Sequence, residues 1–159
     1  MKKTNYDDLF TKEDLYTSYD GGRIFFEDKN LEIPYNGIVI DYFKDVLNWE
    51  FEVKNGFMEG IEKVYYEETG ELMEQNEIKR NYKDGLVKEF YKSGNLKSIC
   101  IVIKNVFIYE VYYDEFGNIT EKKYSLSKDE LNSHIYDDIR DKIDSYMEKY
   151  KDIKELCLN

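Results

Sequence analysis

The 159-residue sequence contains no alanine and only one proline, Pro34. Alanine is the strongest helix former, whereas tyrosine and phenylalanine favour the pleated, half-buried surface of a sheet. The chain has 16 tyrosines and nine phenylalanines. Its length falls within the range of a single domain, and a compact fold of this size would bury roughly 70% of the unfolded surface. The composition therefore predicts a mainly β fold.

Long hydrophobic runs are also missing. The longest apolar run, residues 99–103, is far too short to cross a bilayer. Met1-Lys2-Lys3 has the charge of a signal-peptide start, but the residues that follow, 4–8, are polar instead of apolar. We therefore expect a cytoplasmic protein that does not contact membranes.

Histidine and cysteine, which serve many catalytic and metal sites, are scarce. The single histidine, His134, excludes a histidine pair within one chain, and neither Cys100 nor Cys157 has a C-x-x-C partner. Both cysteines are expected to be buried free thiols, since each lies in an apolar pattern, and one disulfide between them is the alternative. No glycine-rich phosphate loop follows a strand. We therefore expect a non-catalytic protein with no cofactor, no metal and no small-molecule substrate.

The formal net charge of −11 is concentrated near the start of the chain. Residues 1–78 carry 19 acidic and 8 basic side chains, whereas residues 79–104 carry 2 acidic and 7 basic ones. An acidic surface repels nucleic acids and attracts basic proteins at long range, although net charge can also serve solubility alone. Direct RNA or DNA binding through residues 79–104 is a further alternative, which the overall charge disfavours.

Four aromatic doublets recur at nearly constant spacing. They are Tyr42-Phe43, Tyr65-Tyr66, Phe90-Tyr91 and Tyr112-Tyr113, with first members 23, 25 and 22 residues apart. A turn signal follows each doublet, near Val46, Gly70, Gly94 and Gly117. An apolar residue comes next, namely Trp49, Leu72, Leu96 or Ile119. A glycine precedes the first three doublets by five residues, at Gly37, Gly60 and Gly85.

This period predicts tandem β-hairpins that form an open, twisted antiparallel sheet of about eight to ten strands. Alternation places the first members of the doublets on one face and the second members on the other. One hairpin cannot bury such rings alone, so each ring is expected to pack against its counterpart in the next hairpin. An ordinary antiparallel meander with accidental spacing is the alternative.

The two ends of the chain depart from this period. Residues 1–34 are expected to form a degenerate N-terminal cap of the repeat domain 1–126, with a strand at 23–26 and a helical turn at 12–16. Ser127 and Glu130 form a capping box, and apolar residues follow at i, i+4 spacing as far as Cys157. We therefore predict a long amphipathic helix within residues 127–159, mainly over 128–156. It would cap the open end or cover one face of the last hairpins, with partner binding as the alternative role.

Residues 33–118 resemble a known repeat family. The phrase Ile33-Pro34-Tyr35-Asn36-Gly37-Ile38-Val39-Ile40-Asp41-Tyr42-Phe43 resembles the Pro-Tyr-x-Gly-x-x-x-x-Tyr-Tyr opening of bacterial MORN-type repeat proteins, and residues 82–96 are similar to the body repeat. The group is labelled the YwqK-type antitoxin family. The resemblance implies an antitoxin or immunity protein that silences a cognate toxin. The fourth unit, which lacks the leading glycine, and the C-terminal helix depart from the family pattern.

These features together predict a non-catalytic inhibitor that binds and blocks a basic, nucleic-acid-acting protein such as a toxin, a nuclease or a CRISPR effector. Carboxylates would replace phosphates, and tyrosines would provide contact area at low entropic cost. The candidate contact residues are Asp41, Glu50, Glu52, Glu62, Glu67, Glu74, Tyr66 and Tyr91. Alternation puts Asp41 and Phe43 on one face. Whether Glu62 and Tyr66 share that face depends on the strand register, which the sequence leaves open. A structural or scaffold repeat protein with no inhibitory role is the alternative.

Overall fold

A computed structural model of the chain describes residues 1–13, 22–126, 130 and 137–155. The chain divides into two compact units, Met1–Tyr82 and Lys83–Asn159, called the first and the second unit below. The elements up to the boundary are β1 (Lys3–Asn5), η1 (Tyr6–Asp8), β2 (Phe10–Glu13), β3 (Arg23–Phe26), β4 (Gly37–Phe43), β5 (Val46–Lys54), β6 (Phe57–Tyr65) and β7 (Leu72–Lys79). Those that follow are β8 (Tyr82–Phe90), β9 (Leu96–Ile103), β10 (Val106–Tyr113), β11 (Ile119–Tyr124), α2 (Asp137–Lys149) and α3 (Lys151–Glu155).

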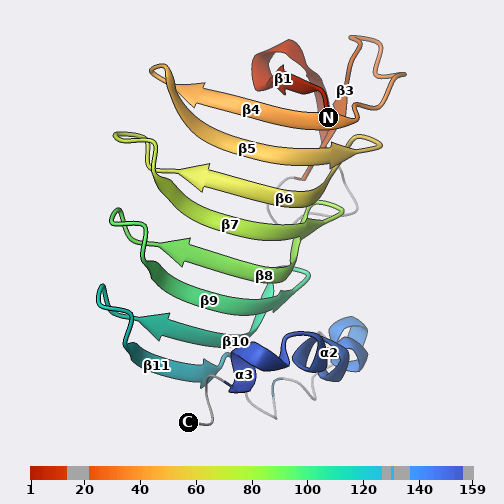
Figure 1. The fold of residues 1–159 in the computed structure, drawn as a ribbon. Helices are drawn as coiled ribbons and strands as arrows, with labels where there is room; N and C mark the ends of the chain where they lie inside the picture. Colours follow the sequence, from red (N-terminus) through yellow and green to blue (C-terminus); the bar gives the residue numbers. More distant parts are fainter. Residues whose placement is uncertain (14–21, 127–129, 131–136, 156–159) are drawn as a thin grey trace. The chain divides into compact units, whose positions relative to one another are not determined.

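In both units the strands pair into an open, mostly antiparallel sheet arrangement, and helices follow at the C-terminal end. This arrangement confirms the expected fold class. In the first unit the strand order is β1-β4-β5-β6-β7, and β1–β4 is a parallel pair (Figure 1). In the second unit the order is β8-β9-β10-β11, with antiparallel pairs throughout. Hairpin turns after β4, β6, β8 and β10 lie where the sequence predicted them.

The N-terminal residues cap the first unit without adding a hairpin to the series. The strand expected at 23–26 is β3, which pairs with β2 in a separate two-stranded sheet. The helical turn expected at 12–16 is wrong at Lys12 and Glu13, because these residues pair with Ile24 and Arg23. Residues 14–16 lie outside the described part of the chain.

The Tyr35-to-Gly37 phrase has a packing role. Tyr35 is fully buried, and its hydroxyl lies 3.0 Å from Thr4 Oγ1 and 3.1 Å from the Ile38 carbonyl. A Cβ added to Gly37 would lie only 2.4 Å from that hydroxyl. Glycine is therefore required so that the β4 backbone can pass directly over the tyrosine and hold β1 beside it.

A β-bulge recurs where each hairpin leaves its turn. In each of the hairpins β4–β5, β6–β7, β8–β9 and β10–β11, one residue of the returning strand has no direct opposite. These extra residues are Asn48, Met73, Lys97 and Thr120. The register corrects one position of the predicted period, the apolar residue that follows the first turn. Leu47, not Trp49, pairs with Tyr42 as Leu72 pairs with Tyr65. The reason is that Lys44 and Asp45 form a two-residue turn, shorter than the turn after Tyr65.

Two-residue turns at the opposite ends of the strands were not predicted. Both residues of each turn have positive φ, as in type I′ hairpins, at Asn55-Gly56, Arg80-Asn81 and Lys104-Asn105. Asn81 and Met58 bond each other twice, from Met58 N to Asn81 Oδ1 (2.8 Å) and from Asn81 N to the Met58 carbonyl (3.0 Å). Asn105 makes the same pair of bonds with Lys83. The turns at Arg80-Asn81 and Lys104-Asn105 are thereby fastened to the start of the preceding hairpin.

The aromatic doublets do not form the core, contrary to the expected stacking of rings. None of their eight residues is buried, and Tyr42 and Phe43 are 49% and 42% exposed. The doublets lie at the strand ends beside the bulges. The first core forms farther along the strands, around Phe25, Val39 and Phe51, where the N-terminal segment covers the sheet.

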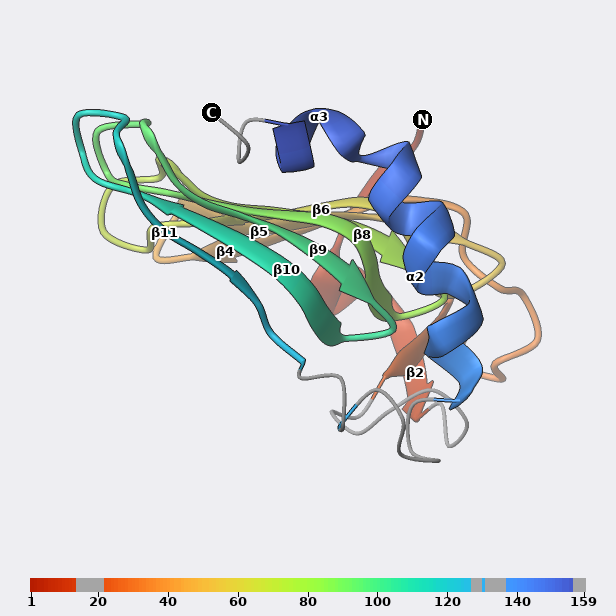
Figure 2. The same cartoon turned by 90° about the horizontal axis from the view of Figure 1, so that it is seen from below.

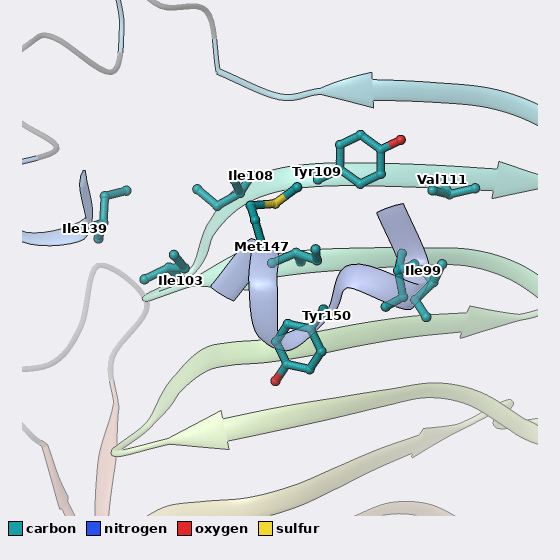
Figure 3. Packing of buried hydrophobic residues seen from close by; sticks show 10 residues of the cluster. Ile99, Ile103, Ile108, Tyr109, Val111, Ile139, Met147 and Tyr150 are labelled. Atoms are coloured by element: carbon teal, nitrogen blue, oxygen red, sulfur yellow. The ribbon is translucent and has the colours of Figure 1, made fainter. Parts of the chain in front are cut away.

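The second unit is built around the C-terminal helices, which lie over one face of its strands (Figure 2). Ile139, Met147 and Tyr150 pack against a sheet surface that includes Ile99 and Val111 (Figure 3). This confirms that the apolar stripe covers one face of the last hairpins. None of the described helices is long and apolar enough to span a membrane.

Where the structure describes it, the predicted C-terminal helix is interrupted once. Two helices, α2 and α3, meet at Tyr150, where the Ile153 amide bonds the Tyr150 carbonyl three residues back. Tyr150 and Ile153 are both buried, so the break keeps the apolar stripe on the sheet. Ser127, His134 and Cys157 lie outside the described residues, as does most of the expected first half of the helix.

Candidate functional site

The strand register of the first unit brings three of the predicted acids onto one face. Asp41 pairs with Trp49, Trp49 with Val64, and Val64 with Glu74, so these four residues form a row across β4–β7, called the Trp49 row. The next row of the same face contains Val39, Phe51, Glu62 and Asn76, and is called the Glu62 row. Directly paired residues share a face of the sheet, so Asp41, Glu62 and Glu74 all lie on the side of Trp49.

Hydrogen bonds connect the two rows. Trp49 Nε1 donates to Glu62 Oε1 over 2.9 Å. Asn76 Nδ2 donates to Glu62 Oε2 over 2.8 Å and to Glu74 Oε2 over 3.2 Å. Glu62 is 8% exposed and Asn76 is fully buried. The Glu62 carboxylate is therefore held by two neutral donors, and no described cation pairs with it.

The Asn76 side chain leaves one acceptor unsatisfied. Its Oδ1 is buried and has no hydrogen-bond donor. An unmet buried acceptor costs about 1–3 kcal/mol. The Glu62 row therefore contains one acceptor, Asn76 Oδ1, that no described donor satisfies.

The Trp49 row is partly exposed, unlike the adjacent Glu62 row, which is buried. Asp41, Trp49, Val64 and Glu74 are all half-buried. The Tyr6 ring lies against the indole, with centroids 6.2 Å apart. Both aspartates that follow Tyr6 in η1 are exposed. Two half-buried carboxylates, those of Asp41 and Glu74, thus share the row of the partly exposed indole.

Glu50 lies on the opposite face, in an ion pair. Its carboxylate contacts Lys3 Nζ at 2.7 Å and Lys63 Nζ at 3.4 Å. The hydrogen bond from Lys3 lowers the pKa of Glu50, and Lys63 adds to the effect. Because Lys3 belongs to β1, this carboxylate fastens the edge strand to the sheet.

Glu52 shares that opposite face and fills the space above a glycine. Its Oε1 lies 3.4 Å from the Ile61 amide, and a Cβ at Gly60 would come within 2.6 Å of its Oε2. Gly60 has a φ of +126°. The absence of a side chain at Gly60 is therefore what admits the Glu52 carboxylate, which gives Glu52 a packing role.

The remaining predicted residues are dispersed. Glu67 is exposed in the turn after β6, and Tyr66 begins that turn by donating its amide to the Glu71 carbonyl. Tyr91 belongs to the second unit, where its hydroxyl donates to the Tyr113 carbonyl over 2.8 Å. The eight predicted residues do not form one surface. Trp49 and Asn76, which the prediction omitted, complete the set that does.

The second unit contains a polar cluster around Glu110. The hydroxyls of Tyr112 and Ser125 both donate to its carboxylate. The hydrogen bond to Glu110 raises the pKa of Tyr112, and burial together with Glu110 raises the pKa of the Cys100 thiol to about 12. Cys100 is a buried free thiol, as predicted. The thiolate and the phenolate are therefore both disfavoured here.

The basic side chains of residues 79–104 do not gather into one patch. In the second unit, Lys83 and Lys104 lie beside the turn after β9, whereas Lys92 lies in the turn after β8, at the other end of the strands. Lys88 pairs with Ile99 on the helix-covered face, and Lys97 is paired with Glu89 at 3.2 Å. This dispersal weakens the case for a nucleic-acid site.

Comparisons with known proteins give no further guide to the site. The chain matches no family model, no curated protein and no solved structure. Among the described residues no group of three or more His, Cys, Asp or Glu side chains could hold a metal ion. The functional proposal therefore rests on the chemistry of the Trp49 row and of the adjacent Glu62 row.

Proposed function

We propose that this chain is a non-catalytic inhibitor that associates with a basic, nucleic-acid-acting protein and blocks it. The main support is the uneven charge of the two units. The first unit carries 19 acidic and 10 basic side chains, a net charge of −9, and the second carries 15 acidic and 13 basic, a net charge of −2. A strongly acidic unit attracts basic surfaces at long range and accelerates their association.

The Trp49 row supplies the second requirement of such a protein, a surface for close contact. Buried aromatic anchors and charge pairs dominate the energetics of protein interfaces, and tryptophan is enriched among them. Trp49 is half-buried and its neighbours in the two rows include Asp41 and Glu74. The resemblance to MORN-type antitoxins favours the same function, with a toxin or nuclease as partner and the cytoplasm as location.

The test is affinity capture from the native host followed by mass spectrometry. The variant is the triple reversal Asp41→Lys, Glu67→Lys and Glu74→Lys, which leaves the structural contacts of Glu50 and Glu62 intact. The matched control makes the same charge change on exposed residues of the second unit, with Glu115→Lys, Glu121→Lys and Asp141→Lys. Circular dichroism verifies that both variants stay folded.

We expect the unaltered chain and the control to retain a basic protein in stoichiometric amount, and the first-unit reversal to lose it. The purified chain should then inhibit the activity of that protein. Retention of no basic partner, or equal retention by the first-unit reversal, would contradict the proposal and favour a scaffold role.

A further inference from the structure

We propose that the outer edge of β4 at residues 41–43, called the open β4 edge below, binds an extended segment of the basic partner. The segment adds to the sheet of the first unit as a further strand, in line with β1. The inference rests on the proposed function and deepens it, because it names the place of contact and the backbone conformation of the segment that binds there.

The edge strand β1 covers only part of β4. It pairs with residues 38–40, whereas β4 continues to Phe43. After β1 the chain turns as η1 onto the face of the sheet, where Tyr6 lies against Trp49. Figure 1 shows the last part of β4 extending past both elements, with no strand along its outer side. Within the described part of the chain, residues 41–43 are therefore an unpaired sheet edge.

The backbone of Tyr42 presents its hydrogen-bonding groups on this edge. The Ile38 amide donates to the Lys2 carbonyl over 2.8 Å, so the backbone groups of Ile38 point toward β1. Backbone groups of alternate residues point to the same side of a strand, hence those of Ile40 and Tyr42 point that way too. Because β1 ends opposite Ile40, the N–H and the carbonyl of Tyr42 are left for a further strand. Such unpaired groups are a template for pairing with another chain.

The side chains of the open β4 edge do not protect it from pairing. Exposed edges are commonly protected by lysine or proline within the strand. The outer strand of the second unit, β11, follows this rule, since it contains Lys122 and Lys123. Residues 41–43 contain neither lysine nor proline, and Tyr42 and Phe43 are both exposed. Aromatic side chains favour strands and pack well against the side chains of a neighbouring one.

The charges around the open β4 edge indicate a basic occupant. One carboxylate lies within the edge, one is exposed in the turn that follows, and two are exposed in η1, which contacts β4; they are Asp41, Asp45, Asp7 and Asp8. Two cations lie near them. Lys3 is bound to Glu50 at 2.7 Å, and Lys44 Nζ lies 5.0 Å from the centroid of the Phe43 ring. The surplus is negative, so a segment with basic side chains complements it.

The same charges oppose a second copy of this chain as the occupant. Pairing two open β4 edges would bring the carboxylates of Asp41 and Asp45 from both copies together, and each first unit has a net charge of −9. Asp41 also belongs to the Trp49 row. A basic segment on the open β4 edge would therefore lie next to the surface proposed above for close contact.

The probes are three six-residue synthetic peptides with blocked ends, titrated into the full chain by calorimetry. The first alternates lysine and valine, the second is the same peptide with every backbone nitrogen methylated, and the third has glutamate in place of lysine. Methylation keeps the charge but removes the donors that a strand needs. We expect the methylated peptide to bind at least roughly tenfold more weakly than its parent, because each lost hydrogen bond contributes about fivefold. We expect no measurable binding of the glutamate peptide.

Hydrogen exchange of the full chain, followed by NMR, locates the bound peptide. We expect the Tyr42 amide to exchange roughly tenfold more slowly at saturating lysine–valine peptide, because it then donates to the added strand. The amides of Lys122 and Lys123 on β11 are the internal control, and their exchange should change by less than about twofold.

Two substitutions at one position separate the backbone from the ring. Tyr42→Pro removes the outward N–H, and proline is tolerated on the outer side of an edge strand. Tyr42→Thr is the matched control, because it removes the ring but keeps the N–H and a side chain that favours strands. We expect Tyr42→Pro to bind the lysine–valine peptide roughly fivefold more weakly than Tyr42→Thr. Circular dichroism verifies folding, and the methylated peptide tests the same bonds on the unaltered chain if Tyr42→Pro does not fold.

The inference is overturned if the lysine–valine peptide does not bind, if the methylated or the glutamate peptide binds equally well, or if the Tyr42 amide gains no protection. It is also overturned if a basic partner is captured and Tyr42→Pro retains it as well as Tyr42→Thr, a result that leaves the proposed function standing. Conversely, strand addition of the lysine–valine peptide without any captured basic partner would refute the proposed function alone.

Discussion

The indole N–H of Trp49 donates to Glu62 Oε1 across the β5–β6 pair, so a buried carboxylate fixes the one tryptophan of the chain. The other oxygen of Glu62 accepts from Asn76 on β7. One carboxylate thereby connects three strands and also belongs to the candidate site. Its structural and its functional roles can be separated by choosing substitutions with care.

Replacing Glu62 by alanine should destabilise the first unit. The Trp49 N–H and one Asn76 N–H would lose their acceptor in a buried setting, at about 1–3 kcal/mol for each unsatisfied group. We expect the free energy of unfolding of Glu62→Ala to fall by about 3 kcal/mol in urea denaturation followed by tryptophan emission. Glu67→Ala, at an exposed turn, is the control and should change it by less than about 0.5 kcal/mol. Equal effects of the two substitutions would contradict the buried network.

Core and doublet aromatics should differ sharply in their contribution to stability. Phe51 is 1% exposed and packs against Phe25, whereas Tyr42 is 49% exposed. Phe51→Ala should cost roughly 3–5 kcal/mol, the range for aromatic truncation in a packed core. Tyr42→Ala should cost less than about 1 kcal/mol. Thermal denaturation of both variants measures the difference, and a reversed order would restore the doublets as the core.

The Glu50 ion pair should make stability depend on pH. Its pKa lies below the ordinary value of 4.5 because Lys3 donates a hydrogen bond to it. A carboxyl with a lowered folded pKa stabilises the fold above its ordinary pKa, and this contribution is lost as the pH falls through the lowered value. Glu50→Gln should therefore be less stable than the unaltered chain at pH 7. The difference should shrink on acidification below pH 4. A difference that is constant with pH would refute the prediction.

The Cys100 thiol should not react in the folded protein. Burial and the neighbouring Glu110 carboxylate raise its pKa to about 12, so the thiolate that attacks an alkylating reagent is scarce near neutral pH. In a Cys157→Ser background, we expect no labelling by iodoacetamide at pH 8 without denaturant and complete labelling of one thiol in urea. Mass spectrometry counts the adducts, and rapid native labelling would show that the strand opens readily.

Alanine at Gly60 should destabilise more than alanine at Gly117. Both glycines have positive φ, +126° and +85°, but only at Gly60 would the new Cβ meet the Glu52 side chain, whereas Gly117 is open. Strained backbone conformations cost of order 1–3 kcal/mol. We expect Gly117→Ala near the lower end and Gly60→Ala at or above the upper end. The two unfolding free energies decide the order.

The sequence predicted the hairpin series because turn chemistry and aromatic spacing are local signals. It misplaced Trp49 by comparing positions relative to a turn whose length differs in the first hairpin. The turns at Arg80-Asn81 and Lys104-Asn105 lack glycine, so only their asparagines indicated a turn. Asn55-Gly56 is a stronger turn signal, but it lies outside the spacing pattern of the aromatic doublets and was not used. The prediction that the doublets are buried failed for a different reason. The residues that cover the sheet, such as Phe25, are distant in the sequence, so the spacing of the doublets did not indicate where the cover lies.

The candidate site depended on register, which the sequence did not determine. A shift of one residue moves every side chain to the other face, so Asp41, Glu50 and Glu62 looked equivalent before the pairing was known. The structure separates Glu50, which pairs with Lys63, from Glu62, which pairs with Phe51. Asn76 could not be recognised at all, because its role comes from contacts with Glu62 and Glu74 across the sheet.

The asparagine fastenings join positions about one hairpin apart, Met58 to Asn81 and Lys83 to Asn105. Each hairpin that carries such a turn thus brings its own attachment to the hairpin before it, together with its own bulge and its own glycine turn. Each of these attachments involves neighbouring hairpins only, so it does not depend on the total number of hairpins. Gain or loss of one whole hairpin would preserve every such attachment, so the chain has the means to change length by duplication or deletion in steps while the two differently covered ends stay as they are.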